Sequence, residues 1–369
     1  MLKNIQETVQ KQKKILLKKT EQQKLKFKKF IKPKPEESIG VFNLFLIGSI
    51  FVIIVLSISK INSRAIIKAS LKNNPPPFQI TTDFFVDKNS TAKNRDGSPT
   101  KPFKTISQAL TFLKKNPNIK NIYLKPAQYK GNLEIPQNLN IYAYQPETSI
   151  VALTSDKKNL TLLGNNIIQG LTLKNARYGI YIPAEAQSIQ IKNCQIKESN
   201  WYGVYNEKHP ETNEQYKLEI TNSQISGNFL QGLYLQKGTF VMKNSKSINN
   251  GEEGIDLHID MNSTILNSEI SNNGEGGIET ELGNINLTIE NCLIENNKSS
   301  GINLQSYSEN SFIKIQNNQI NNNTDFGIRC ALHASFTSPY FAQAFETHPT
   351  EINTFSDNGV LEIDSNCQK

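Results

Sequence analysis

The chain has 369 residues and a formal net charge of +8, and all of this excess lies in one short segment. Residues 1–38 hold twelve lysines against four glutamates, which leaves 29 basic and 29 acidic side chains in the remainder. The basic character of the chain therefore belongs to this tail, and a lysine-rich tail can in principle bind nucleic acid. The length allows either two average domains or one elongated repeat domain.

The lysine-rich segment runs directly into a long apolar segment, residues 39–59, which contains no charged side chain. Its 21 residues are long enough to cross a bilayer core of about 30 Å, and they predict a transmembrane helix. Because the lysines precede the span, the positive-inside rule places the N-terminus in the cytoplasm and the rest of the chain outside it. The basic region is too long for a cleaved signal peptide and no A-x-A site follows, which favours an uncleaved signal-anchor.

The lysines of residues 1–38 have two interpretations. They form either a basic amphipathic helix on anionic lipid or a solvated charge that retains this segment in the cytoplasm. Both interpretations place the tail next to a membrane, and neither involves nucleic acid.

Residues 60–79 are predicted to form a linker, since the motif NNPPPF near its end cannot continue a helix. Residues 80–135 then predict an N-terminal cap and the first coil of a larger fold. Asp96–Gly97 is a turn signal, and Thr105 is placed to cap a helix that begins at Ile106. Such a helix would cover the open end of a stacked sheet, which otherwise promotes aggregation.

The same region resembles a known family. The runs DGSPTKPFKTISQAL, from Asp96, and YLKPAQYKGNLEIPQNLNIYAY, from Tyr123, are similar to the N-terminal part of pectin lyase-like right-handed parallel β-helix proteins. The resemblance covers about residues 80–330. Together with the apolar segment 39–59, it predicts an all-β, right-handed parallel β-helix preceded by one transmembrane helix.

An internal repeat supports this fold. Six asparagines are each followed ten residues later by a glycine, and successive units are 22 to 29 residues apart. The pairs are Asn193 and Gly203, Asn222 and Gly232, Asn244 and Gly254, Asn267 and Gly277, Asn291 and Gly301, and Asn317 and Gly327. Each strand is too short to bury a core alone, but coils stacked about 4.8 Å apart share one. Residues 136–330 are therefore predicted to form the β-helix repeats and residues 331–369 the C-terminal cap.

Both repeated residue types have a structural interpretation. Asparagine tolerates turn conformations, and an aligned column of asparagines can hydrogen-bond from coil to coil. Glycine before each strand is explained by a positive φ, which only glycine adopts without strain. Apolar residues lie two positions before each asparagine and one after each glycine as the predicted core, while Ser247 stands where other repeats have isoleucine.

The four cysteines fall into two groups. Cys194 and Cys292 occupy the same column four coils apart, about 19 Å at the strand spacing, so they cannot pair and are predicted to fill the core. Cys330 lies in the last repeat and Cys367 in the C-terminal segment, and a disulfide between them is a hypothesis for what holds the end cap. No spacing of cysteine and histidine resembles a zinc site.

The outward positions of the strands form one face. The column two residues after the glycine reads Tyr181, Tyr205, Tyr234, Asp256, Glu279, Asn303 and Arg329. The column four residues after it contains His258 and Glu281. With Trp201, the three tyrosines form either a ribbon of flat apolar rings that binds sugars or a ladder that only stabilises the sheet. The predicted substrate-binding residues are Tyr181, Trp201, Tyr205, Tyr234, Glu281, Asn303 and Arg329.

A cluster of acids follows the tyrosines. Residues 247–297 contain ten aspartates or glutamates and no lysine or arginine, a local charge of about −10 on two or three coils. Like charges on neighbouring strands destabilise a sheet, so this cluster is expected to attract a cation or to raise carboxyl pKa values. A calcium site formed by Asp256, Glu279 and Glu281 is the corresponding prediction.

The stretch GIDLHID has two catalytic interpretations. It is similar to the Gly-aromatic-Asp-Pro-His stretch of mannuronan C-5-epimerases and related alginate lyases, which implies acid-base roles for Asp256 and His258 with Glu279 as a further carboxylate. Leu257 replaces the proline of that stretch, and Glu253 stands at a tyrosine position. Alternatively, Asp256 and Glu279 form a glycosidase pair, since adjacent coils hold their backbones about 4.8 Å apart. The motifs of polygalacturonases and the arginine-rich face of pectate lyases are absent.

Two classes of function follow. The sequence favours a membrane-anchored, extracytoplasmic β-helix that binds cell-surface or extracellular polysaccharide, with catalysis not assured by any motif. The alternative is a polysaccharide-active lyase, epimerase or glycosidase that uses Asp256, His258 and Glu279. A structural or adhesive rod is a further alternative, because fold alone does not determine function.

Overall fold

The computed structural model describes residues 82–144, 151–152, 157–207, 216–236, 238–258, 261–280, 286–305, 311–331, 344–347, 349 and 352–368. The predicted tail 1–38, transmembrane span 39–59 and linker 60–79 lie outside these ranges. Within them, no helix is both long and apolar enough to cross a membrane.

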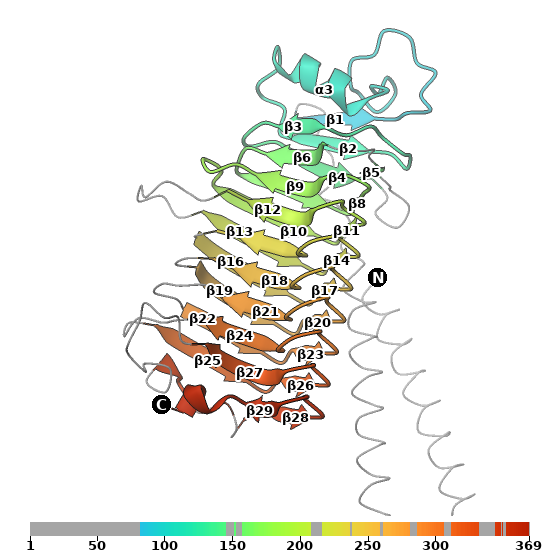
Figure 1. The fold of residues 1–369 in the computed structure, drawn as a ribbon. Helices are drawn as coiled ribbons and strands as arrows, with labels where there is room; N and C mark the ends of the chain where they lie inside the picture. Colours follow the sequence, from blue (N-terminus) through green and yellow to red (C-terminus); the bar gives the residue numbers. More distant parts are fainter. Residues whose placement is uncertain are drawn as a thin grey trace, which may run out of the picture. The chain divides into compact units, whose positions relative to one another are not determined.

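Three parallel sheets stack coil by coil into a β-helix, which confirms the predicted all-β fold class (Figure 1). Sheet A contains β1 (Asp83–Val86), β2 (Asn121–Leu124), β4 (Asn140–Ala143), β7 (Asn166–Gln169), β10 (Ser188–Lys192), β13 (Lys217–Thr221), β16 (Gly238–Lys243), β19 (Met261–Leu266), β22 (Asn286–Glu290) and β25 (Phe312–Gln316). Sheet B contains β3 (Leu133–Ile135), β6 (Lys158–Leu162), β9 (Tyr178–Ile182), β12 (Tyr202–Asn206), β15 (Leu233–Leu235), β18 (Ile255–Leu257), β21 (Ile278–Thr280), β24 (Ile302–Gln305), β27 (Phe326–Ala331) and β29 (Leu361–Ile363). Sheet C contains β5 (Val151–Ala152), β8 (Thr172–Lys174), β11 (Gln195–Lys197), β14 (Gln224–Ser226), β17 (Lys246–Ile248), β20 (Glu269–Ser271), β23 (Leu293–Glu295), β26 (Gln319–Asn321) and β28 (Thr354–Ser356).

The core lies inside the coils, where apolar residues stack on one another. In sheet B the inward column is fully buried and consists of Ile180, Val204, Leu233, Ile255, Ile278, Ile302 and Ile328. In sheet C, Ser247 is buried between Ile225 and Ile270, and its hydroxyl donates to the carbonyl oxygen of Gly254 at 2.6 Å. The break in the isoleucine column is therefore compensated by a hydrogen bond.

Asparagines form columns along the described coils, and two of these columns have different roles. The predicted column, which includes Asn244 and Asn267, has φ values between 50° and 56°, which confirms its turn role. The coil-to-coil ladder of side chains belongs to a second column, Asn228, Asn250, Asn273, Asn297, Asn323 and Asn358. In this ladder Asn250 donates to Asn273 at 3.0 Å, and Asn273 donates to Asn297 at 2.9 Å. The ten-residue spacing did not single out this column.

The repeat glycines are required by close packing, and the prediction that they adopt a positive φ is wrong. The positive-φ glycines of the described chain are Gly97, Gly164, Gly170, Gly227 and Gly238. A Cβ atom on Gly254 would lie 2.8 Å from the carbonyl oxygen of Gly277 and 2.7 Å from the side-chain nitrogen of Asn273. Any larger residue at position 254 would therefore push the next coil away.

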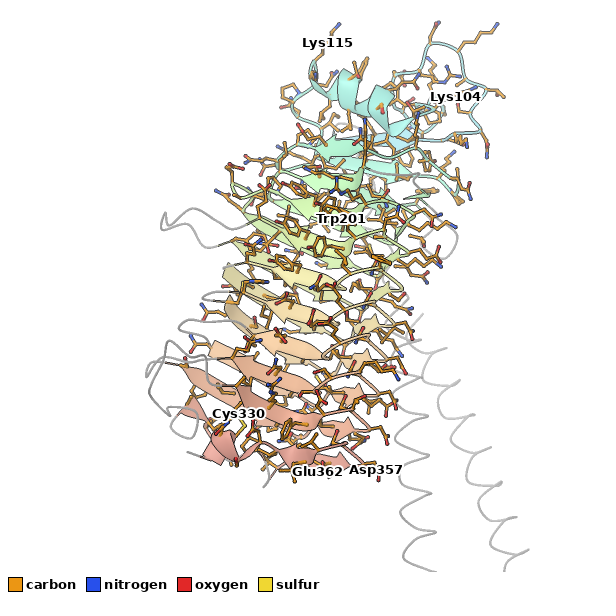
Figure 2. The ribbon with its side chains drawn as sticks, in the orientation of Figure 1. Lys104, Lys115, Trp201, Cys330, Asp357 and Glu362 are labelled. Atoms are coloured by element: carbon orange, nitrogen blue, oxygen red, sulfur yellow. A yellow bond between two sulfur atoms is a disulfide. The ribbon has the colours of Figure 1, made fainter. Side chains whose placement is uncertain are left out.

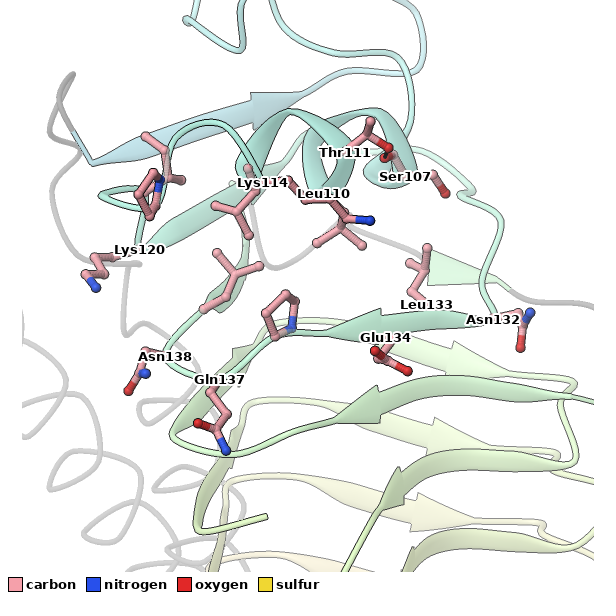
Figure 3. A pocket seen from close by; sticks show the side chains of 15 residues that line it. Ser107, Leu110, Thr111, Lys114, Lys120, Asn132, Leu133, Glu134, Gln137 and Asn138 are labelled. Carbon is pink, nitrogen blue, oxygen red and sulfur yellow. Dashed lines mark hydrogen bonds between the residues drawn. The ribbon is translucent and has the colours of Figure 1, made fainter. Parts of the chain in front are cut away.

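The N-terminal end of the β-helix is covered by helix α3 (Ile106–Leu113), as predicted (Figure 1). Thr105 accepts a hydrogen bond from the backbone N–H of Gln108, whose side chain accepts one from the backbone N–H of Thr105. This capping box fixes the start of the helix, and Ile106 and Ala109 are buried against the first coil. A crevice of about 620 Å³ lies between α3 and β3 (Figure 3).

The C-terminal end is held by a disulfide between Cys330 on β27 and Cys367 in the 3-10 helix η2 (Ser365–Gln368), with Cα atoms 5.2 Å apart. Figure 2 places Cys330 at this end of the stack. Strands β28 and β29 pair in parallel with β26 and β27, so the coils continue past residue 330. Cys194 and Cys292 are free and buried, as expected for core residues.

We expect Asn273→Ala to lower the free energy of unfolding by about 2–3 kcal/mol, because it leaves buried amide groups of Asn250 and Asn297 with fewer partners. Asn267→Gly is the matched control, since glycine adopts the same positive φ and the change should stay within about 1 kcal/mol. Urea unfolding followed by circular dichroism measures both. Equal effects of the two changes would contradict a special role for the second column.

Candidate functional site

Aromatic rings cover the outward face of sheet B over three successive coils. We call Tyr178, Tyr181, Trp201, Tyr202, Tyr205 and Tyr234 the tyrosine platform. The predicted column is confirmed: Tyr181 and Tyr205 stack with ring centroids 5.6 Å apart and 16° between planes, and Tyr205 and Tyr234 stack at 5.3 Å and 12°. Tyr178 and Tyr202 form a second stack at 5.8 Å and 17°. The platform therefore presents two parallel rows of phenol rings.

Cationic side chains lie at the N-terminal end of the platform. The Nζ atom of Lys158 lies 3.1 Å from the ring centroid of Tyr181, and the guanidinium of Arg177 lies 3.2 Å from that of Trp201. Burial lowers the pKa of Lys158. A pocket of about 430 Å³ beside them is lined by Lys157, Lys158, Arg177, Tyr178 and residues of the preceding coil. This end can bind polar or anionic groups.

The predicted catalytic residues lie at the other end, where acids continue the column in register. Asp256 follows Tyr234, and Glu279 follows Asp256. The carboxylate of Asp256 lies 3.1 Å from Nε2 of His258, whose ring centroid is 4.3 Å from that of Tyr234. The structure therefore brings Asp256 and His258 into direct contact, beside the platform and one coil from Glu279.

Amide side chains surround Glu279. Asn303 and Gln305 each donate a hydrogen bond to its carboxylate at 2.7 Å. Asn303, which was predicted to bind substrate, therefore supports the acid on the neighbouring coil. Arg329 continues the column beyond Asn303 and is exposed. Charge-assisted hydrogen bonds of this kind favour an ionised acceptor.

A buried glutamate, Glu253, belongs to this end of the face and was not among the predicted site residues. Gln231 donates to its carboxyl group at 3.0 Å. Burial raises the pKa of Glu253 to about 9, and a hydrogen bond to Glu275 and the charge of Asp256 act in the same direction. Burial also raises the pKa of the neighbouring Glu252. Glu253 therefore holds its proton more strongly than an ordinary glutamate.

The sequence contains a pattern that could have identified Glu253 and the other residues of this face that were not predicted. Tyr178, Tyr202, Gln231 and Glu253 each precede the repeat glycine of their coil. Alternation along a strand predicts that residues two apart share a face. This column lies at the glycine corner where the strands begin, and the alternation does not hold across that corner. A comparison of the residue before the repeat glycine from one coil to the next would have identified these residues.

The described acids of residues 247–297 do not lie on one face, since those on strands occur in all three sheets. Glu269 lies on sheet C and pairs with Lys246, while Glu290 lies on sheet A and Glu295 on sheet C. Glu281 lies outside the described residues. Among the described side chains, no group of three histidines, cysteines or acids could hold a metal ion. The calcium site at Asp256, Glu279 and Glu281 stays a prediction.

Comparison with known proteins agrees with this fold. The family described as right handed beta helix region matches residues 211–340. The described residues fold as a right-handed parallel β-helix. Pectate lyase Pel9A has 15% sequence identity over 78% of this chain and 79% of its own, with a TM-score of 0.55. The chain therefore resembles a pectate lyase in fold.

Two other solved structures are similar at lower TM-scores. The A-module of mannuronan C-5 epimerase AlgE4 from Azotobacter vinelandii has 14% identity, 76% and 97% coverage of the two chains and a TM-score of 0.42. The catalytic domain of a GH87 α-1,3-glucanase in complex with tetrasaccharides has 13% identity, 80% and 68% coverage and a TM-score of 0.41. Among curated proteins, none matches the chain.

The protonation of Glu253 predicts a pH-dependent stability. Its pKa is higher in the folded chain than the ordinary value of 4.5, so the folded state binds more protons between the two values. The stabilising contribution is complete below pH 4.5 and is lost as the pH rises toward about 9. We expect Glu253→Gln, which keeps the shape and cannot ionise, to remove this loss, which at about 1.4 kcal/mol per pKa unit is on the order of several kcal/mol.

The measurement is urea unfolding of the wild type and Glu253→Gln at pH 5, 7 and 9. Glu295→Gln, on the outer side of sheet C, serves as the matched control. If wild type and Glu253→Gln lose stability in parallel as the pH rises, Glu253 is already ionised in the folded protein at pH 5.

Proposed function

We propose that the outward face of sheet B binds a polysaccharide. The observation that carries this proposal is the double row of half-buried tyrosines, with Trp201 at its side and 37% exposed. Flat rings of this kind pack against the C–H faces of sugar rings, while phenol hydroxyls and nearby amides reach the sugar hydroxyls. Figure 2 shows Trp201 on the part of the stack where these rings lie.

A ladder that only stabilises the sheet is the competing explanation of the tyrosines. Two features favour a ligand. The cations of Lys158 and Arg177 lie over the ring faces of Tyr181 and Trp201 at one end, and an Asp-His pair lies at the other. Neither feature is needed to stack the rings. Pectate lyase Pel9A, which has a similar fold, acts on a polysaccharide by its name, and this agrees with a glycan ligand for the present chain.

The second candidate function is catalysis on a polysaccharide. It is favoured by one observation, the contact at 3.1 Å between Asp256 and His258. A carboxylate orients the ring and stabilises its protonated form, so His258 becomes a better proton acceptor. In a lyase or epimerase this pair would move the proton, with Glu279 as a further carboxylate. In a glycosidase, Asp256 and Glu279 would be the pair of carboxyl groups that the mechanism requires.

We also propose that residues 39–59 anchor the protein in a membrane with the β-helix outside the cytoplasm. The support is the uncharged segment of 21 residues after twelve lysines. The disulfide between Cys330 and Cys367 agrees with an oxidising compartment. In this arrangement the sheet B face would meet cell-surface or extracellular glycans, and the lysine tail would meet anionic lipid on the cytoplasmic side.

The double change Tyr205→Ala and Tyr234→Ala tests the binding proposal. We expect at least a tenfold loss of affinity, about 1.4 kcal/mol, for any glycan that binds the wild type on a glycan array. Phe312→Ala is the matched control, because Phe312 is an aromatic residue 42% exposed on sheet A. Retained binding in the double variant, with circular dichroism unchanged, would show that the tyrosines only stabilise the sheet.

Asp256→Asn tests the catalytic candidate. For any polysaccharide that the wild type converts, kcat should fall by about 10²-fold or more, because the amide no longer stabilises a charged His258. Product release measured by mass spectrometry follows the reaction, and Glu219→Gln on sheet A is the control. Turnover that Asp256→Asn leaves unchanged would exclude the Asp-His pair as the catalytic group.

A further inference from the structure

Three cationic side chains line one cavity at the N-terminal end of the tyrosine platform. Lys157 and Lys158 belong to the coil of β6, and Arg177 belongs to the next coil, where its backbone N–H donates to the carbonyl oxygen of Lys157 at 2.9 Å. Lys158 pairs in register with Tyr178, which lines the same cavity of about 430 Å³. Successive coils are about 4.8 Å apart, so a single ligand group in this cavity is within reach of all three side chains.

The cavity carries an excess of positive charge. Among the described residues, Glu134 is the one carboxylate that lines it, against three cations. Within the same part of the chain, none of the three cations forms an ion pair with an acid. Burial lowers the pKa of Lys158, and the charges of Glu207 and Glu134, which act in the opposite direction, do not offset this effect. An anion in the cavity would supply the missing compensation.

Aromatic rings position two of these cations. Nζ of Lys158 lies 3.1 Å from the ring centroid of Tyr181, and the guanidinium carbon of Arg177 lies 3.2 Å from that of Trp201. A guanidinium that stacks on a ring by its face keeps the N–H groups at its edge available to an acceptor. The platform therefore holds both cations beside the cavity with donors that a ligand can use.

A solvated charge is the competing explanation of these side chains. Lys88 and Lys93 have that character, because both are exposed and neither lies over an aromatic ring of the described residues. Lys158 and Arg177 are half-buried and packed on rings, and fixing a long side chain in this way costs conformational entropy. Their ordered placement beside a cavity favours a binding role.

We propose that this cavity binds a tetrahedral oxyanion, a sulfate or phosphate ester, on a polysaccharide that lies along the tyrosine platform. A phosphate ester presents three terminal oxygens that accept strong hydrogen bonds, and a sulfate ester has the same geometry. Three separate cations from two coils suit three such oxygens, whereas a planar carboxylate is satisfied by a single guanidinium fork. This inference rests on the proposed polysaccharide binding and specifies its substrate class.

The charges along the face also orient such a ligand. Asp256 and Glu279 continue the outward column beyond Tyr234, at the opposite end of the platform from Lys158 and Arg177. An anionic substituent is attracted to the cationic end and repelled by the acidic end. The face therefore suits a chain with an ester at one end and neutral sugars toward the Asp-His pair, rather than a chain charged at every unit.

The test compares four forms of a β-1,4-linked glucose hexamer by isothermal titration of the full-length protein. One form is neutral, and the others carry a sulfate ester, a phosphate ester or a carboxylate at the sixth carbon of the same terminal unit. We expect at least one ester to bind at least about tenfold more tightly than the neutral hexamer and at least about threefold more tightly than the carboxylate. The tighter of the two esters distinguishes sulfate from phosphate.

Variants connect this preference to the cavity. Lys158→Gln with Arg177→Gln should reduce the preference for the ester over the neutral hexamer to less than about threefold. Lys88→Gln with Lys93→Gln, which removes the same charge from exposed side chains of the N-terminal cap, should preserve it. If the cavity variant loses its native circular dichroism, Lys157→Gln takes its place, because Lys157 is exposed, and should reduce the preference at least about twofold.

Three results would overturn the inference. They are equal affinity for the neutral and esterified hexamers, a carboxylate that binds as tightly as the better ester, and an effect of the cavity variant no larger than that of the cap variant. Each leaves the proposed polysaccharide binding intact if Tyr205→Ala with Tyr234→Ala still weakens it. If no hexamer binds, the glycan array decides. Ligands that carry either ester support the inference, ligands that all lack both overturn it alone, and absence of any ligand overturns both proposals.

Discussion

The close approach of successive coils at the glycine corner is the constraint on which the rest of the structure depends. At Gly254 the absence of a side chain lets the carbonyl oxygen of Gly277 and the amide of Asn273 approach to distances that a Cβ atom would block. The asparagine ladder occupies this space and ties each coil to the next. Because the corner fixes the spacing, the strands on either side keep one register through the whole stack.

This fixed register turns the surface of sheet B into columns with one residue per coil. It explains how the tyrosines stack without a partner sheet, and it also forces acids onto acids, as at Asp256 and Glu279. The fold tolerates the acids in two ways. Amides of Asn303 and Gln305 donate to Glu279, while Glu253 retains its proton because it is buried. Both features reduce the repulsion between acids that the fixed register places on neighbouring coils.

Sequence reasoning predicts the parts of this architecture that repeat at a fixed offset. The buried column around Ile255, the cap helix with Thr105 and the order of the tyrosine column all follow from apolar periodicity and turn chemistry. The ladder column around Asn273 was not separable from the turn column, because each supplies an asparagine in almost every coil. The reason for glycine at position 254 depends on the neighbouring coil, which no single strand reveals. Glu253 was missed because corner residues do not follow strand alternation.

The distribution of cations along the face bears on the chemistry it can perform. Elimination or epimerisation at a uronate needs a positive charge beside the acid-base pair to stabilise the carboxylate as it gains electron density. Lys158 contacts Tyr181, which lies three coils before Asp256, and Arg329 lies three coils after it. At about 4.8 Å per coil each is about 14 Å from Asp256 along the stack. At that distance neither cation stabilises charge at Asp256, so the described residues provide no cation beside the Asp-His pair for elimination or epimerisation at a uronate.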